Sequence, residues 1–160
     1  MSKILKNIEN FNLVVLHLFS RLYESFPRPL DINGDQAIDI GFDAVPDNST
    51  DKEAWEIGTM DYDVIVWLAE EGFLRYQPDP EGREGYFWKV RLTLKGLTIL
   101  GCVPTSLNQN NSKEPLIQKA RQAISSTASA VSRESIKLVV AEIFKLALAP
   151  DSVISSLISV

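Results

Sequence analysis

Acidic side chains are the residues of this sequence whose spacing comes nearest to a chemical site. Four oxygen-bearing side chains fall at positions 1, 3, 5 and 9 of a twelve-residue calcium-binding loop, namely Asp31, Asn33, Asp35 and Asp39. However, Gln36 stands where such a loop needs a glycine for its sharp turn, and Phe42 stands where it needs a bidentate acid. Too few oxygen ligands remain, which favours a solvated acidic loop over a calcium site. We therefore expect no bound metal.

Residue types that act as nucleophiles or general bases are scarce. His17 is the only histidine and Cys102 the only cysteine, and the sequence has neither a glycine-rich phosphate loop nor a nucleophile elbow. An acid pair such as Asp61 and Asp63 could serve acid–base catalysis only if a pocket raised the pKa of one member. Solvated helix faces explain such pairs more simply. We predict that the protein is not an enzyme and uses no cofactor.

Charge is distributed unevenly along the chain, whose net charge is −5. Residues 31–73 hold twelve acidic side chains against Lys52 alone, whereas residues 1–30 carry a net +2 and residues 74–160 a net +4. The composition, 45% hydrophobic and 23% charged, is that of a globular protein. The N-terminus lacks the apolar run of a signal peptide, and no stretch is long and apolar enough to span a membrane. These features lead us to expect a cytoplasmic protein without a membrane partner.

The clearest succession of elements lies between residues 60 and 98. Apolar residues at helical spacing predict a helix over residues 60–71, which Gly72 ends because glycine readily adopts the left-handed conformation of a helix terminus. Beyond it the pattern predicts a strand over residues 73–76, a turn-rich loop over 78–85 and a second strand over 86–92. Thr93 is then expected to cap a short helix that ends near Gly101.

Three short segments within this stretch have the residue types of a known family: Leu68-Ala69-Glu70-Glu71-Gly72-Phe73, Asp79-Pro80-Glu81-Gly82-Arg83-Glu84 and Leu92-Thr93-Leu94-Lys95-Gly96. They resemble the second half of MarR-type winged-helix regulators. The resemblance implies a winged helix-turn-helix in which residues 60–71 read DNA and Arg83 on the wing reaches toward the minor groove. The chain departs from the family at Gly82, where the family has an aspartate, and at Glu84, where it has a second arginine.

The remaining elements extend this unit in both directions. Apolar periodicity predicts a helix over residues 4–26, and residues 30–32 have the types of a short strand. We expect a winged-helix domain over residues 1–107, a polar linker over 108–114 and a helical segment over 115–160. The predicted fold is therefore mainly α with a small β-hairpin: a winged helix-turn-helix domain with a long C-terminal helical appendage.

Aromatic residues and a helix cap are predicted from local patterns within the first domain. Thr50 and Glu53 have the spacing of a capping box, which opens a short helix. Trp55 and Trp67 lie on apolar helix faces, so we expect both in the core. We expect Trp67 to pack against Trp88 beneath the wing.

The C-terminal segment ends in a helix that is apolar around most of its circumference. Its apolar positions include Ile136, Val139, Val140, Ile143, Phe144 and Ala147. Such a helix must be buried against another surface. We favour a second copy of the chain as that surface, which makes the protein a homo-oligomer through these six residues, with packing on its own winged helix as the alternative.

Two functional interpretations remain. The helix over residues 60–71 contains no lysine or arginine and begins with acids that would repel phosphates. We therefore favour a non-catalytic interaction protein, such as an adaptor, antitoxin or immunity protein, that binds a basic protein partner through an acidic face. The residues predicted for that face are Asp51, Glu53, Glu56, Asp61 and Asp63. The alternative is a dimeric transcriptional regulator that binds double-stranded DNA with help from Arg83, Lys89 and Arg91.

Overall fold

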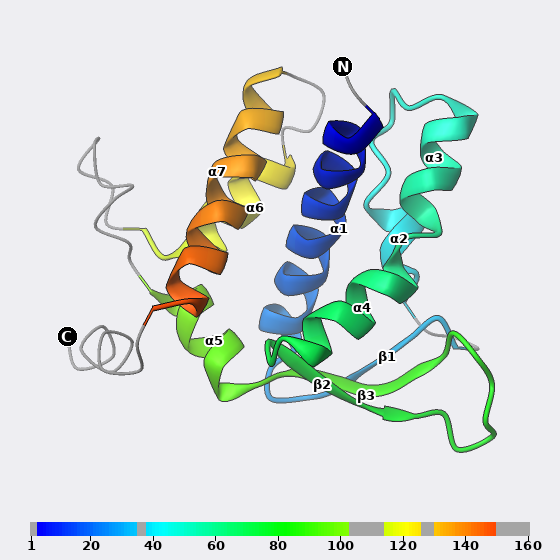
Figure 1. The fold of residues 1–160 in the computed structure, drawn as a ribbon. Coiled ribbons are helices and arrows are strands. Elements are labelled where there is room, and N and C mark those ends of the chain that lie inside the picture. Colours follow the sequence, from blue (N-terminus) through cyan, green and yellow to red (C-terminus); the bar gives the residue numbers. More distant parts are fainter. Residues whose placement is uncertain (1–2, 35–37, 103–113, 126–129, 150–160) are drawn as a thin grey trace.

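The computed structural model describes residues 3–34, 38–102, 114–125 and 130–149. Within these ranges the chain is mainly helical and has one small three-stranded antiparallel sheet, as predicted. The elements, shown in Figure 1, are α1 (Lys3–Ser25), β1 (Leu30–Ile32), α2 (Ile40–Asp43), α3 (Asp51–Gly58), α4 (Asp61–Glu70), β2 (Leu74–Pro78), β3 (Phe87–Leu92), α5 (Leu94–Gly101), α6 (Leu116–Ser125) and α7 (Ala130–Ala147). None of the helices in the described ranges is long and apolar enough to cross a membrane.

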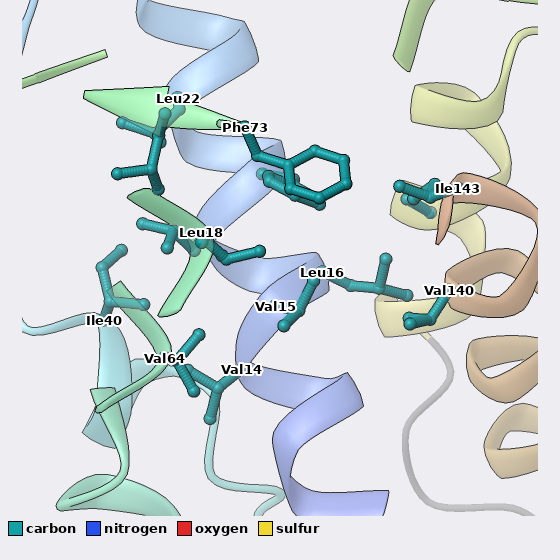
Figure 2. Packing of buried hydrophobic residues seen from close by; sticks show 14 of the residues in the cluster. Val14, Val15, Leu16, Leu18, Leu22, Ile40, Val64, Phe73, Val140 and Ile143 are labelled. Atoms are coloured by element: carbon teal, nitrogen blue, oxygen red, sulfur yellow. The ribbon is translucent and has the colours of Figure 1, made fainter. Parts of the chain in front are cut away.

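Helix α1 runs through the middle of the molecule (Figure 1). Five of its central residues, Val14, Val15, Leu16, Leu18 and Phe19, are fully buried, because other helices cover α1 on two sides. Figure 2 shows Ile40 of α2 and Val64 of α4 on one side of α1, and Val140 and Ile143 of α7 on the other. Leu16 of α1 extends toward the α7 side. One continuous hydrophobic core therefore joins the N-terminal and C-terminal parts of the chain.

Helix α7 belongs to this core and is not an appendage. Ile136, Val139, Val140 and Ile143 are all buried by contacts within one chain, and α7 packs on α1, α5 and α6. Phe144 lies between three aromatic rings, with ring centroids 6.2 Å from Phe11, 5.5 Å from Trp67 and 5.6 Å from Phe73. Ala147 is half-buried beside the same core.

We predicted self-association because the apolar face of this helix needed a second copy to cover it. That reason is wrong, because the chain covers the face itself. Helix α6 lies between the predicted linker and α7, and it folds back so that both helices reach α1. Most of the predicted linker over residues 108–114 lies outside the described residues. Self-association remains a prediction, but these six residues no longer support it.

The sheet has the strand order β1-β3-β2, with β3 in the centre. Its inner face carries Leu74, Phe87, Val90 and Leu92, which are buried in the core beneath α1 and α4. Thr93 fixes the junction with α5, because its hydroxyl accepts a hydrogen bond from the Gly96 amide at 3.1 Å. The same hydroxyl lies within donating distance of the Gly72 and Phe73 carbonyl oxygens in the turn between α4 and β2. This junction holds the sheet against α4.

Two predictions about tryptophans were wrong. Trp67 is 38% exposed and packs edge-on against Phe11 at 5.4 Å and against Phe144, both on helices that lie far from it in the sequence. The Trp88 ring instead lies beside the Lys89 ammonium, 4.5 Å from the ring centroid. Trp55 is 66% exposed and lies on the surface.

Candidate protein-binding surface

Helices α2 and α3 are positioned by a close approach between two glycines. A Cβ atom on Gly41 would collide with the backbone carbonyl oxygen of Gly58, so a larger residue at position 41 would force the helices apart. The missing side chain of Gly58 leaves room for the ring of Phe42. The Asp39 carboxylate caps α2 by accepting a hydrogen bond from the Phe42 amide at 3.1 Å. These contacts hold Phe42 at the outer edge of the helix pair.

The predicted capping box forms at the start of α3. The Thr50 hydroxyl accepts a hydrogen bond from the Glu53 amide, and the Glu53 carboxylate accepts one from the Thr50 amide, each at 3.2 Å. Trp55 follows in the next turn and its ring meets the Phe42 ring, with centroids 6.3 Å apart and planes at 62°. Phe42 is 46% exposed, so both rings remain largely open to solvent.

Two exposed acidic residues lie close to this aromatic pair. Asp51 lies one helical turn before Trp55 on the same face of α3, and Asp43 directly follows Phe42. Glu56, three residues after Glu53, instead lies on the side of α3 that faces Lys6. We call the residues Phe42, Asp43, Asp51 and Trp55 the acidic aromatic surface. Asp51 and Asp43 are exposed, and the Glu56 carboxylate lies 4.0 Å from the Lys52 ammonium, at the limit of an ion pair. The surface therefore combines apolar area with negative charge.

Glu53, also predicted for the acidic face, points away from it. Its carboxylate accepts a hydrogen bond from the Lys6 ammonium of α1 at 2.8 Å. This bond lowers the pKa of Glu53 and raises the pKa of Lys6. Both residues line a cleft of about 590 Å³ between α1, α3 and α7. Glu53 thus joins α3 to α1, and its charge is neutralised within the chain.

The prediction that Asp61 lies on the acidic face is wrong, because Asp61 is buried and only 7% exposed. It accepts hydrogen bonds from the Tyr62 amide at 2.8 Å, from the Asn33 side chain and from the Gly41 amide. Burial nevertheless dominates and raises the pKa of Asp61. These contacts with Asn33 and Gly41 at the first turn of α4 remove Asp61 from the surface. Asp63, two residues later, is exposed as predicted.

The predicted nucleic-acid contacts fall on two different parts of the molecule. The Arg83 guanidinium forms a two-pronged bond with Asp79, with Nε–Oδ2 at 2.9 Å and Nη2–Oδ1 at 3.1 Å, and its carbon lies 4.3 Å from the Tyr86 ring centroid. The bond from Arg83 lowers the pKa of Asp79. Arg83 is thereby held within the loop between β2 and β3, whereas Lys89 and Arg91 are exposed on the sheet.

The aromatic members of the site were missed by sequence reasoning, although a signal existed. Trp55 and Ile57 are two residues apart, so they lie about 200° apart around a helix and cannot share one face. Ile57 is buried, which turns Trp55 outward. The acids flanking Trp55 in the sequence agree with that orientation.

Neither a metal site nor a relative offers a further lead to function. Among the described residues, no three His, Cys, Asp or Glu side chains lie together as a metal site would need. Two members of the calcium-loop pattern have other roles: Asp39 caps α2, and Asp31 accepts a hydrogen bond from the Lys89 amide at 3.0 Å. Comparisons with protein-family models, curated proteins and solved structures found no match for this chain. Function is therefore inferred from surface chemistry.

Proposed function

We propose that this chain is a non-catalytic winged-helix interaction protein that binds a basic protein partner through its acidic aromatic surface. The observation that carries the proposal is Trp55, a large aromatic residue with 66% of its surface in solvent, beside the exposed ring of Phe42. Aromatic anchors of this kind dominate binding energy at protein interfaces. An adaptor, antitoxin or immunity protein would use such a surface.

The chemistry of the partner follows from the charges around the anchor. Residues 31–73 carry a net charge of −11, and the exposed carboxylates of Asp51 and Asp43 belong to this region. Such a field attracts a basic partner and speeds association. A lysine or arginine of the partner could also lie over the Trp55 ring, where its charge is attracted by the aromatic face. A segment that alternates basic and apolar residues fits this surface best.

The order of elements supports the winged-helix part of the proposal. Helix α1, strand β1, helices α3 and α4, and the β2–β3 hairpin follow one another as a winged helix requires, and β3 lies between β1 and β2. The hairpin loop over residues 79–86 would be the wing. A relationship to MarR-type regulators remains part of the proposal, resting on the three segments of residues 60–98.

Binding of double-stranded DNA is the second candidate and is less well supported. Helix α4 would enter the major groove, but its exposed residues include Asp63 and Glu70 and none is basic. These acids would repel the DNA phosphates, and without basic side chains α4 cannot displace the counterions whose release normally drives DNA affinity. Arg83, the wing residue, is already bound to Asp79. Of the three residues predicted to contact DNA, Lys89 and Arg91 remain exposed and favour this alternative.

Substitution of Trp55 tests the protein-binding proposal. The tagged chain and its Trp55→Ala variant should be compared for capture of proteins from an extract of the source cells, followed by affinity measurement on the purified partner. Loss of an interface anchor typically costs 2 kcal/mol or more, so the Kd should rise by about 30-fold or more. Leu138→Ala is the matched control, because Leu138 is 50% exposed on α7 and lies outside the surface.

A charge reversal and a DNA-binding assay distinguish the two candidate functions. Asp51→Lys should slow association, and the difference from wild type should shrink as salt rises. If the wild type instead binds a defined DNA duplex at nanomolar concentration in about 150 mM salt, and Trp55→Ala binds it equally well, the regulator is the better proposal. Equal capture of a basic partner by Trp55→Ala would remove the acidic aromatic surface as the binding site.

A further inference from the structure

The outer face of the sheet carries two arginines directly opposite each other. Arg75 on β2 and Arg91 on β3 are register partners in the antiparallel pair, and both are exposed. Like charges at such positions destabilise a sheet, since their Cβ atoms are about 5 Å apart. Neither arginine forms an ion pair with any residue in the described part of the chain. An anion held between the two guanidinium groups would relieve this repulsion.

An aromatic ring and an amide lie on the same face, one position farther along the hairpin. Trp88 is the register partner of Gln77. Both side chains point outward, because Phe87, directly before Trp88, is buried in the core, and Tyr76, directly before Gln77, packs against Phe87. Trp88 is half-buried, so part of its ring remains open to solvent. Cations, a ring and a hydrogen-bonding amide are thus brought together on two adjacent strands.

A backbone irregularity adds a third cation to this face. Lys89 has a positive φ of 51°, and the register between β2 and β3 shifts at this point, as expected for a bulge. The hydrogen bond from the Lys89 amide to Asp31 holds the bulge in place. The exposed Lys89 side chain then lies against the Trp88 ring. Its flexible ammonium can move from the ring to a nearby phosphate.

We propose that this outer sheet face, formed by Arg75, Gln77, Trp88, Lys89 and Arg91, binds a single-stranded nucleic acid. One phosphate would lie between Arg75 and Arg91, where guanidinium groups can donate paired hydrogen bonds. An unstacked base would lie against Trp88, and the Gln77 amide can reach the edge of a base.

The chemistry favours a single strand over the other polyanions. A duplex hides the faces of its bases by stacking, so it would leave Trp88 without a partner. An acidic peptide could satisfy the arginines but has no aromatic base to stack on the ring. This site is separate from the acidic aromatic surface on α2 and α3 and does not depend on the protein-binding proposal.

Fluorescence anisotropy of labelled ten-nucleotide oligo-dT and oligo-rU with the intact chain tests the proposal. With three cations involved, log K should fall with log salt at a slope of about −2. The double variant Arg75→Gln/Arg91→Gln should reduce the slope to about −0.7. Trp88→Leu should weaken binding about five- to a hundredfold without changing the slope, because stacking does not release counterions. Arg21→Gln, an exposed arginine on α1, is the matched control.

Several results would overturn the proposal. They are absence of oligonucleotide binding at about 50 mM salt, equal affinity for a duplex with no effect of Trp88→Leu, or tighter binding of a poly-glutamate peptide than of either oligonucleotide. Circular dichroism checks that each variant is folded, and Trp88→Phe, which keeps a ring, should retain most of the affinity. Arg75→Gln should also raise the urea midpoint by relieving the cross-strand repulsion. Trp55→Ala should bind oligonucleotides like wild type, which separates this test from that of the protein-binding surface.

Discussion

Removal of the Ile143 side chain tests whether α7 is part of the core of its own chain. Ile143 is 0% exposed and faces the side of α1 that carries Leu16 (Figure 2). Ile143→Ala deletes three carbon atoms, worth about 2.4 kcal/mol at about 0.8 kcal/mol each. The cavity left behind adds about 1–2 kcal/mol. The expected loss of about 3–4 kcal/mol is a large share of the stability of a typical domain, about 5–15 kcal/mol.

Urea unfolding followed by circular dichroism measures this loss, at several protein concentrations so that any contribution of self-association is visible. Leu138→Ala, on the exposed side of the same helix, should change the free energy of unfolding by less than about 0.5 kcal/mol. A chain ending at Ser112 would remain folded if the C-terminal segment were an appendage, whereas the structure leads us to expect loss of cooperative unfolding. The reasoning is refuted if Ile143→Ala costs under about 1 kcal/mol while converting a dimer into monomers in sedimentation.

Three other substitutions probe the contacts that position the acidic aromatic surface. Because burial raises the pKa of Asp61, its ionisation is less favourable in the folded state than in the unfolded state. The contribution of Asp61 to the free energy of unfolding should therefore fall as pH rises from about 3.9, the ordinary pKa, to the raised folded value. Asp61→Asn should lack that fall, and parallel pH profiles for variant and wild type would contradict this assignment. Gly41→Ala should cost about 2–3 kcal/mol in urea unfolding, more than Gly58→Ala, since the new Cβ meets a rigid carbonyl at position 41 but the movable Phe42 ring at position 58; equal losses would argue against the close approach of α2 and α3.

Local elements were predicted well because each depends on residues close together in the sequence. The helix expected over residues 4–26 is observed as Lys3–Ser25, where proline follows the last turn. The capping box at Thr50 and the cap at Thr93 are both formed. Gly72 ends the α4 turn with a positive φ of 83°. In each case hydrogen bonds within a few residues decide the conformation, so tertiary packing is not needed to predict it.

The candidate site was predicted only in part, because burial depends on residues far apart in the sequence. Asp61 and Asp63 have the same chemistry and lie in the same helical turn, yet Asp61 is buried against Asn33 and Gly41 whereas Asp63 is exposed. Glu53 was placed on the acidic face, but Lys6 of α1 draws it to the other side of α3. Arg83 was predicted to contact DNA, but its guanidinium donates hydrogen bonds to Asp79 in the same turn.

For the C-terminal helix, the sequence alone determined that a large apolar face had to be covered. The amount of apolar surface follows from residue type and helical spacing, and that surface is unfavourable in water whatever its neighbours are. The identity of the covering surface was decided only by tertiary structure, in which α6 folds back so that α7 reaches α1. The hydrophobic effect is non-directional, so it sets how much surface is buried but not which partner buries it.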